Sequence, residues 1–486
     1  MKVLSLSTSF TLLSLAISAQ LYAQTPDTAA STQTTAVVAT QKPVQLAPIV
    51  ITATRSAQSI AEIAGTVQSI EQKQIEQQAA AGRKLADILA QLVPSLSPSS
   101  GTTTNYGQTM RGRQVLILID GVAQTGSRDA ARQLNSISPD SIEKIEVVSG
   151  ASSIYGSGAT GGIINVITKK ATKDGLSFES KVGVTSGDNF RNDALAYDAY
   201  QSVGFNQSDW NGFLGAGYTK RGEIQDSHGD RIGPEIAQTD RQDTETVDVN
   251  GRLSWQLTDK QKLSLGAQYY NDQQDSEYGP DYGTNFAVFL GQKPSLKALQ
   301  GFEIDDQPFT KCYAVNAQYQ NTDVLGQELN IEAYYRNEKA RFYPTLLANF
   351  IPAGYYLAYQ SESDIDVAGL RAAITSKLNL ADRDLKLSYG IDYDHEQDKQ
   401  TADLYSFSNN GLKYSNTGRS YDFGPDATIK NLSVFLQGNY DLTEAFNVQA
   451  GIRHQRIESD TTSFKPTLPA IQGDITGQAV GSVAAG

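Results

Sequence analysis

The sequence contains almost no cysteine or histidine, which excludes several kinds of site. Cys312 is the single cysteine, so the chain has neither a disulfide framework nor a cysteine-based metal site. The three histidines, His228, His395 and His454, are far apart and lack the spacing of a zinc site. Although His395 lies in the acidic segment 392–396 (DYDHE), we expect this segment to be a strand end that continues into a polar loop, with no bound metal.

Long apolar runs and an excess of positive charge are also missing. Beyond the N-terminus no stretch approaches the roughly eighteen apolar residues that a membrane-spanning helix needs, which excludes a helical membrane protein. The net charge of −13 argues against a nucleic-acid partner, because such a partner requires a basic surface. The chain does have 24 tyrosines and 41 glycines in 486 residues, and this length suits a small domain followed by a large β architecture.

The N-terminal segments differ sharply in composition. Residues 1–23 have a basic start at Lys2, an apolar stretch and small residues near Ala23, as in a secretory signal peptide. Residues 24–45 are rich in Thr, Ala, Gln and Pro and are predicted to be a flexible linker, because they have too little apolar surface to offset the entropy of ordering. A short β-branched run follows in residues 46–55 (LAPIVITATR).

Residues 141–170 (SIEKIEVVSGASSIYGSGATGGIINVITKK) contain two β-branched runs around a glycine-rich loop. Gly156, Gly158 and Gly161 match the pattern G-x-G-x-x-G, but a dinucleotide site requires a helix that begins at this loop and holds the pyrophosphate. The chain continues instead into IINVITKK, a strand-like sequence. We therefore reject nucleotide binding and expect the glycines to serve tight backbone turns.

One helix, one hairpin and two polar loops are predicted before this segment. Residues 83–92 have apolar side chains on one helical face, and residues 115–119 form an apolar strand before the turn sequence Asp120-Gly121. The polar loops are residues 101–113 and 126–134.

From Leu176 onward apolar and polar residues alternate, which predicts about eleven strands up to Glu458, each with one lipid-compatible face and one polar face. The tyrosine pairs Tyr269-Tyr270 and Tyr334-Tyr335 are expected at the membrane interfaces. Residues 471–486 form a Gly/Ala/Gln tail without a closing strand. Because an open barrel leaves unpaired strand edges, the expectation is that this chain holds the N-terminal part of a longer barrel.

The segment 141–170, together with MRGR at 110–113 and IDGV at 119–122, resembles the plug domain of the TonB-dependent outer-membrane receptors. The resemblance implies an α+β plug domain (residues 56–172) followed by a transmembrane antiparallel β-barrel (residues 173–486), about half of a 22-stranded barrel with the C-terminal strands missing. It also implies the outer membrane of a Gram-negative bacterium. Residues 46–55 then resemble a TonB box, whose extended strand pairs with the TonB protein and transmits its pull. The residues assigned to it are Leu46, Ala47, Pro48, Ile49, Val50, Ile51, Thr52, Ala53 and Thr54.

Three passages, residues 126–162, 275–283 and 325–344, resemble the ferric-aerobactin receptors within this family. The resemblance implies import of an anionic citrate-hydroxamate siderophore, in which iron arrives already chelated, so that neither a cofactor nor a protein metal site is expected. Arginines can bind such a ligand through charge-assisted hydrogen bonds. The candidate siderophore-binding residues are Tyr106, Arg128, Arg132, Tyr278, Tyr282, Arg341 and Tyr343.

Other functions stay open from the sequence. A receptor of the same family for another siderophore or for cobalamin would share the plug and the TonB box. A passive outer-membrane pore would share only the alternating strands. An enzyme is not expected, because an NAD-dependent enzyme would share only the glycines of the 141–170 segment.

Overall fold

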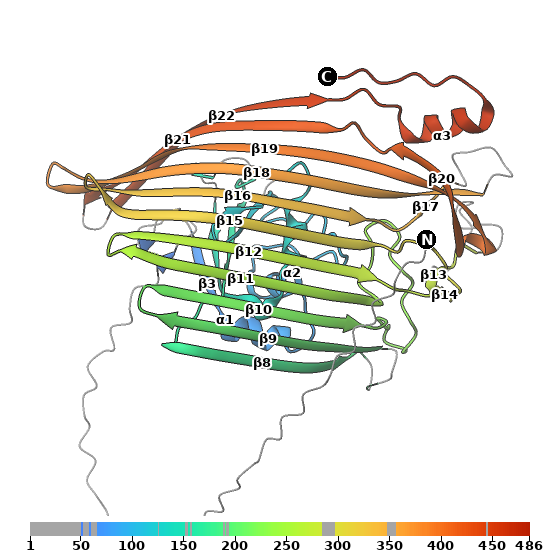
Figure 1. The fold of residues 1–486 in the computed structure, drawn as a ribbon, viewed down its shortest axis with the longest axis horizontal. Helices are drawn as coiled ribbons and strands as arrows, with labels where there is room; N and C mark the ends of the chain where they lie inside the picture. Colours follow the sequence, from blue (N-terminus) through green and yellow to red (C-terminus); the bar gives the residue numbers. More distant parts are fainter. Residues whose placement is uncertain are drawn as a thin grey trace, which may run out of the picture. The chain divides into compact units, whose positions relative to one another are not determined.

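The computed structural model describes residues 50–51, 58–59, 66–124, 126–150, 154–155, 158–187, 190, 194–283, 297–347, 356–443 and 446–486. Among these residues no helix is long and apolar enough to cross a membrane. The first described elements are two short antiparallel strands, β1 (Val50–Ile51) and β2 (Gln58–Ser59). Residues 66–170 form a small domain, which we call the plug, and the later residues form a large sheet (Figure 1).

The plug is built on a five-stranded sheet with the order β3-β6-β7-β4-β5. The strands are β3 (Thr66–Glu71), β4 (Val115–Ile119), β5 (Val122–Ala123), β6 (Ile142–Ser149) and β7 (Gly162–Thr168). β4 and β7 are parallel and the other pairs are antiparallel. Every residue of β4 and β7 is buried, as expected for continuous β-branched sequences that are covered on both faces.

Each face of the plug sheet has its own apolar partner. One face packs on α1 (Gln72–Ala79) and α2 (Leu85–Leu92), so the helical face predicted in residues 83–92 is confirmed. The other face, which includes Leu116, Leu118 and Ile163, packs on Ala373 and Phe435 of the large sheet. Burial of each such Leu or Ile contributes roughly 1.5–3 kcal/mol to the free energy of folding, so this apolar contact helps to hold the plug on the large sheet.

The glycine-rich loop ends in a position where no side chain fits. A Cβ atom at Gly161 would lie 2.8–2.9 Å from the carbonyl oxygens of Gln114, Arg113 and Met110, and Gly162 has a positive φ of 151°. Strand β7 follows directly, and the strand predicted for this stretch is therefore confirmed. The glycines allow β7 to lie beside β4, and they do not open a helix.

Among the described residues the large sheet has thirteen strands, and eleven of them form its main path in the order β22-β21-β19-β18-β16-β15-β12-β11-β10-β9-β8, each antiparallel to its neighbours (Figure 1). These eleven confirm the predicted number of about eleven, and two further short strands pair with β18 and β19. Their bounds are β8 (Gly175–Ser186), β9 (Leu195–Gln207), β10 (Trp210–Arg221), β11 (Thr244–Thr258), β12 (Gln261–Gln274), β15 (Phe309–Val324), β16 (Gln327–Arg341), β18 (Leu357–Leu380), β19 (Arg383–Ser408), β21 (Ala427–Thr443) and β22 (Phe446–Thr461). Within the described part of the chain, β8 and β22 each have one neighbour, so the sheet is open.

Shorter elements extend this sheet at one end. β17 (Thr345–Leu346) pairs with β18, and β20 (Lys413–Asp422) pairs with β19. β13 (Tyr278–Pro280) and β14 (Ala298–Gln300) form a separate two-stranded sheet. The connections at this end are long, for example residues 222–243 and 409–426, whereas those at the opposite end are two-residue turns such as 325–326 and 381–382. We call the two ends the long-loop end and the short-turn end.

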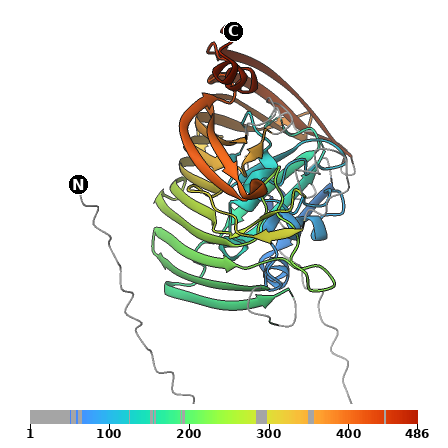
Figure 2. The same ribbon diagram turned by 90° about the vertical axis from the view of Figure 1, so that its right-hand side faces the viewer.

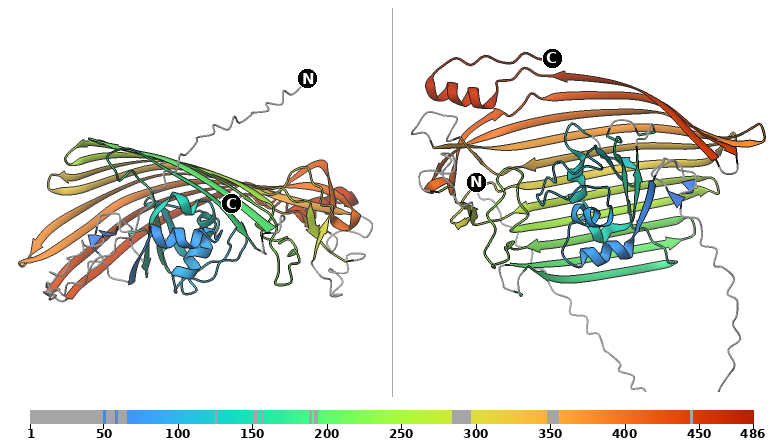
Figure 3. Two further views of the ribbon diagram at one scale, coloured as in Figure 1. Left: turned by 90° about the horizontal axis from the view of Figure 1, so that it is seen from below. Right: turned by 180° about the vertical axis from the view of Figure 1, so that it is seen from behind.

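Alternation along the strands separates an apolar outer face from a polar inner face. On β21, Leu432, Val434 and Leu436 are about half exposed, whereas Ser433 and Gln437 are buried. The plug lies against the inner face (Figures 2 and 3). Neighbouring tyrosines of a strand also face opposite sides of the sheet. Tyr270 and Tyr334 are buried on the inner face, so the prediction that both members of each pair lie at membrane interfaces is wrong for these two residues.

Polar contacts complete the docking of the plug. Arg252 forms an ion pair of 2.9 Å with Asp120, and Lys84 lies 3.7 Å from Asp272. Arg453 connects Asp392, at 2.7 Å, with the carbonyl oxygen of Ile154 in the glycine-rich loop, at 3.0 Å. The inner face of the sheet therefore satisfies much of its polarity through the plug.

Two local predictions are corrected by the structure. Residues 392–396 do not end a strand but lie in the middle of β19, where Asp392 is 1% exposed and its ion pair with Arg453 compensates its burial. The predicted tail at 471–486 begins within a helix, α3 (Thr467–Thr476), whose Ile471 is buried against Leu347 and Leu404. Cys312 is a buried residue of β15, and no group of three metal-binding side chains occurs among the described residues.

Replacement of Gly161 by Ala tests the role of the glycine-rich loop. We expect a loss of about 1–3 kcal/mol of plug stability, because three backbone carbonyls must move to admit the methyl group. Thermal unfolding and limited proteolysis of the purified protein in detergent would measure it. Gly424→Ala is the matched control, since its Cβ would meet no atom within 4 Å. An equal effect of both substitutions would contradict this role.

Candidate functional site

The two polar loops of the plug lie at the long-loop end of the sheet. The first loop (101–113) contacts the β10–β11 connection, where the backbone N–H of Thr103 donates to the carbonyl of Thr239 at 2.9 Å. The second loop (126–134) reaches β19, where the N–H and the hydroxyl of Ser127 donate to Glu396 at 2.7 Å and to Asp398 at 2.9 Å. We call these the first and second apical loops.

Asp129 ties the two apical loops together. One carboxylate oxygen accepts from the N–H of Ala131 at 3.0 Å and caps the 3₁₀ helix Ala130–Asn135, as Asp commonly does at this position. The other oxygen accepts from the N–H of Gly107 in the first loop at 2.7 Å. Asn105 adds a bond to the carbonyl of Ala131 at 3.1 Å. The apical loops therefore form one hydrogen-bonded unit.

Arg241, in the β10–β11 connection, fastens this unit to the sheet. Its Nε donates to the carbonyl of Thr102 at 3.0 Å, and its Nη1 forms an ion pair with Asp87 of α2 at 2.6 Å. Its Nη2 lies 3.3 Å from the hydroxyl of Ser99 and 3.4 Å from the amide oxygen of Asn135. One guanidinium therefore contacts the first apical loop, the residue Ser99 before it, helix α2 and the 3₁₀ helix of the second apical loop.

The candidate residues Arg128 and Arg132 converge on one aromatic ring. Their guanidinium carbons lie 5.2 Å and 5.6 Å from the ring centroid of Phe342, which follows β16. Arg132 is buried and forms an ion pair of 2.8 Å with Glu338. Arg128 is partly exposed, and its Nη1 donates to the hydroxyl of Ser363 at 3.0 Å. Burial and, secondly, the charge of Arg132 lower the pKa of Arg128.

Arg341 lies next to Phe342 but has acidic partners. Its Nε and Nη2 both donate to Glu362, at 3.0 Å and 2.7 Å, and its Nη1 is 2.9 Å from Asp306. Arg341 and Phe342 also line a small cleft with Thr103 of the first apical loop. The two carboxylates therefore compensate the positive charge of Arg341 at the rim of the site.

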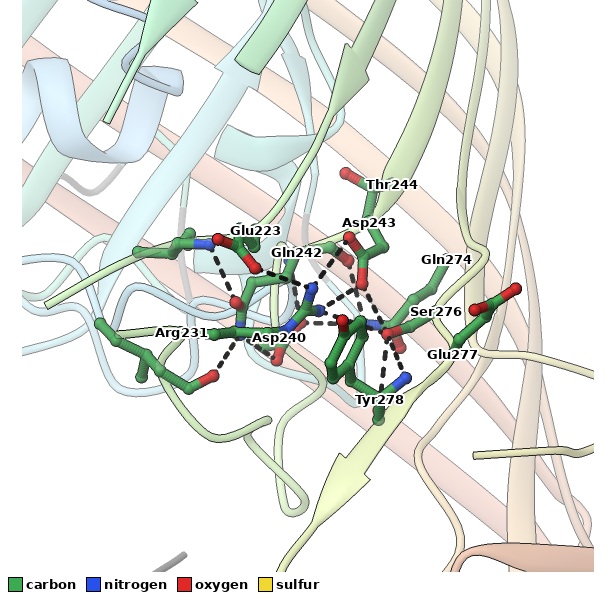
Figure 4. Close-up of polar contacts among 12 residues, drawn as sticks. Glu223, Arg231, Asp240, Gln242, Asp243, Thr244, Gln274, Ser276, Glu277 and Tyr278 are labelled. Atoms are coloured by element: carbon green, nitrogen blue, oxygen red, sulfur yellow. Dashed lines mark hydrogen bonds and ion pairs between the residues drawn. The ribbon is translucent and has the colours of Figure 1, made fainter. Parts of the chain in front are cut away.

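Tyr278 is held by a polar network at the long-loop end (Figure 4). The guanidinium of Arg231 stacks on its ring at 4.0 Å and also pairs with Asp243 and, at 3.6 Å, with Glu223. The hydroxyl of Ser276 donates to the same carboxylate of Asp243 at 2.6 Å. The β10–β11 and β12–β15 connections are therefore linked through one arginine.

Tyr282 and Tyr343 lie together in an apolar cluster formed by the long loops, away from solvent. Both are almost fully buried, and the ring of Tyr343 stacks on Phe302 with centroids 5.2 Å apart. The other members of this loop cluster are Leu346, Ala358, Tyr405, Phe407 and Tyr414. A ligand could reach the two candidate tyrosines only after these loops separate, so their binding role stays a prediction.

The remaining candidates are placed only in part. Tyr106, at the tip of the first apical loop, is 66% exposed. Of the predicted TonB box only Val50 and Ile51 belong to the described residues, and they form β1. Leu46, Ala47, Pro48, Ile49, Thr52, Ala53 and Thr54 lie outside them.

Three residues of this site were missed by sequence analysis. Asp129 lies inside a loop that was singled out only for its arginines, although an Asp before a short helical turn is a capping signal. Phe342 stands between two candidates in the sequence. The sequence contains no pattern that points to Glu338, because it is the fold that brings β16 to the second apical loop.

Family models match both the plug and part of the large sheet. Residues 59–163 match the family model described as TonB-dependent Receptor Plug Domain, and residues 277–481 match TonB dependent receptor-like, beta-barrel. The rhizobactin receptor of Rhizobium meliloti (strain 1021) is 34% identical over 86% of this chain and 56% of its own length. The ferric aerobactin receptor of Klebsiella pneumoniae is 36% identical over 85% and 56%. The chain thus spans somewhat more than half the length of these relatives.

Solved structures agree in fold. The siderophore receptor PirA from Acinetobacter baumannii superposes with a TM-score of 0.57 at 16% identity, over 82% of this chain and 58% of that structure. The unliganded ferric citrate transporter FecA gives a TM-score of 0.63 at 17% identity, over 82% and 57%.

Substitution of Asp129 tests whether the apical loops act as one unit. Asp129→Ala removes both acceptors, so we expect faster hydrogen–deuterium exchange in residues 101–110 and 126–135, by about tenfold for a loss of roughly 1–2 kcal/mol. Asp129→Asn is the control, because it keeps one accepting oxygen and should loosen only one of the two contacts. Unchanged exchange in Asp129→Ala would show that the loops are held independently of this residue.

Proposed function

The chain belongs to the family of TonB-dependent receptors, and we propose on this basis that it serves the active import of a ferric siderophore across the bacterial outer membrane. The observation that carries the proposal is the position of Arg128 and Arg132 on the second apical loop, at the long-loop end of the sheet. Long loops are extracellular in outer-membrane barrels, so this end would receive the ligand.

The proposed substrate is an anionic citrate-hydroxamate chelate of the aerobactin type. Its support is the basic pair at the plug apex together with the rhizobactin and ferric aerobactin receptors among the relatives. Guanidinium groups bind carboxylate and hydroxamate oxygens through charge-assisted, forked hydrogen bonds. The iron is part of the substrate, and no protein ligand to it and no chemical step are proposed.

The proposed mechanism couples binding to a pull from the periplasm. The chelate binds against the apical loops and the barrel loops, the plug shifts, and the segment 46–54 becomes available to TonB, which adds it as a strand to its own sheet. The polar contacts that dock the plug, such as Arg252–Asp120, can exchange for water when the plug moves. Import thus uses a mechanical input from the inner-membrane energising complex.

Binding measurements would identify the substrate. We expect saturable binding of ferric aerobactin to the purified protein in detergent, with a ferric catecholate and cobalamin bound at least about tenfold more weakly, because neither presents carboxylates to the basic pair. Tyrosine and tryptophan fluorescence would report it. Preferential binding of cobalamin or the catecholate would assign another substrate within the family. No saturable binding of any iron chelate would contradict siderophore import.

A proline in the predicted TonB box would separate binding from transport. We expect Ile49→Pro to bind the chelate normally but to abolish uptake of radioactive iron by cells, because proline lacks the backbone donor that strand addition needs. Thr35→Pro, in the predicted linker, is the control and should leave uptake intact. Normal uptake by Ile49→Pro would refute the assignment of the TonB box.

A further inference from the structure

The three candidate arginines at the site differ in their charge compensation. Arg132 has Glu338 at 2.8 Å, and Arg341 has both Glu362 and Asp306 within 3.0 Å. Arg128 forms no ion pair within 4.0 Å in the described part of the chain, and its contacts there are a hydrogen bond to the neutral hydroxyl of Ser363 and the ring of Phe342. Arg128 is therefore the member of the three whose positive charge is not matched locally.

The acidic groups closest to Arg128 are committed to other donors. Glu338 accepts from Gln133 as well as from Arg132. Asp398 accepts from the hydroxyl of Ser127 at 2.9 Å. Neither carboxylate can approach Arg128 without losing a hydrogen-bond partner in a partly buried region. The free energy lost with that partner exceeds the free energy gained from a new contact at the surface.

Phe342 fixes the direction in which Arg128 presents its donors. The two guanidiniums share the ring of Phe342, and a cation held against an aromatic face loses much of its freedom to rotate. The backbone of Phe342 is itself fixed, because its N–H donates to Ser361 and its carbonyl accepts from Gln360, both at 3.0 Å. The ring is thus anchored on the wall of the sheet while the arginines come from the plug.

We infer that Arg128 is the cation that contacts a carboxylate of the anionic ferric chelate, and that Phe342 positions it, whereas the Arg132–Glu338 pair and Arg341 maintain the structure of the site. This inference rests on the proposed function. The remaining N–H groups of Arg128 can donate to the two oxygens of a carboxylate, and the hydroxyl of Ser363 can stay bound to Arg128 or donate to the ligand as well. Arg132 cannot do the same without leaving the buried charge of Glu338 with only the neutral donor Gln133.

Binding of ferric aerobactin to charge-removing variants would separate the arginines. We expect Arg128→Gln to weaken binding by about tenfold or more and to reduce its dependence on salt concentration, because a charged contact is lost. The double variant Arg132→Gln/Glu338→Gln removes a whole ion pair and should lose less binding than Arg128→Gln. Arg383→Gln, at the short-turn end of the sheet and outside the site, is the charge-matched control and should stay within about threefold of the parent. A larger loss in the double variant than in Arg128→Gln would overturn the assignment.

A double-mutant cycle would test the positioning role of Phe342. Phe342→Leu keeps an apolar side chain but removes the π face, and we expect it to weaken binding about three- to tenfold, while Phe342→Tyr restores it. In the Arg128→Gln background the Leu substitution should have no further effect, since Phe342 acts through Arg128. An equal loss in both backgrounds would show that Phe342 only supports the fold.

Chemical modification decides the assignment even if no chelate binds. Phenylglyoxal, followed by peptide mass spectrometry, should modify Arg128 at least about fivefold faster than the ion-paired Arg132 and Arg341, and iron-free citrate should slow the reaction at Arg128 alone. Failure of every chelate to bind, with citrate protection preserved, would refute the proposed function but keep Arg128 as a carboxylate site. Equal rates at the three arginines, or no protection, would overturn the inference itself.

Discussion

The polarity of the inner face of the large sheet determines most of the structure. Alternation places apolar residues outward and polar ones inward, so the inner strands of the sheet, such as β11, β12 and β19, carry buried polar groups that need partners. The plug supplies them through Asp120, Lys84 and the carbonyl of Ile154. Two small apolar contacts join the two parts, one around Phe435 and one in which Val122 packs on Tyr334, Ile365 and Val367. Ion pairs of this kind add little net stability, so they orient the plug without locking it as an apolar interface of equal size would.

This constraint explains why the site forms where it does. The plug presents its longest polar loops at the end where the strands are joined by long connections, and there the loops find donors and acceptors from several strands. Hydrogen bonds from the loop backbone to Asp129 and from Arg241 to the loop backbone fix its conformation. Arg128 is held on this loop by the hydroxyl of Ser363 and the ring of Phe342, whereas carboxylates occupy Arg132 and Arg341. A preorganised cation of this kind loses little conformational entropy when a ligand binds.

Local patterns in the sequence were enough to predict the architecture. The β-branched runs, the glycine-rich loop and the alternation from Leu176 onward predicted the plug strands and the eleven strands of the sheet, because these depend on periodicity and backbone conformation. The wrong predictions concern residues whose side chains alternate between the two faces of a strand, because the two-residue period was not applied to them. Tyr269 and Tyr270 are neighbours in a strand and must face opposite sides. In residues 392–396 the acidic residues Asp392, Asp394 and Glu396 are spaced by two and therefore share the inner face of β19.

The site could be predicted only as a set of residue types, because charge compensation is a property of the fold. Arg128, Arg132 and Arg341 look equivalent in the sequence, each in a polar stretch with acidic residues nearby. Their difference arises from β16 and β18, which bring Glu338 to one arginine, Glu362 to another and only the hydroxyl of Ser363 to the third. Whether an arginine of the plug can bind an anionic ligand therefore depends on the side chains that the large sheet places beside it. For Arg128 these are the aromatic ring of Phe342 and the neutral hydroxyl of Ser363.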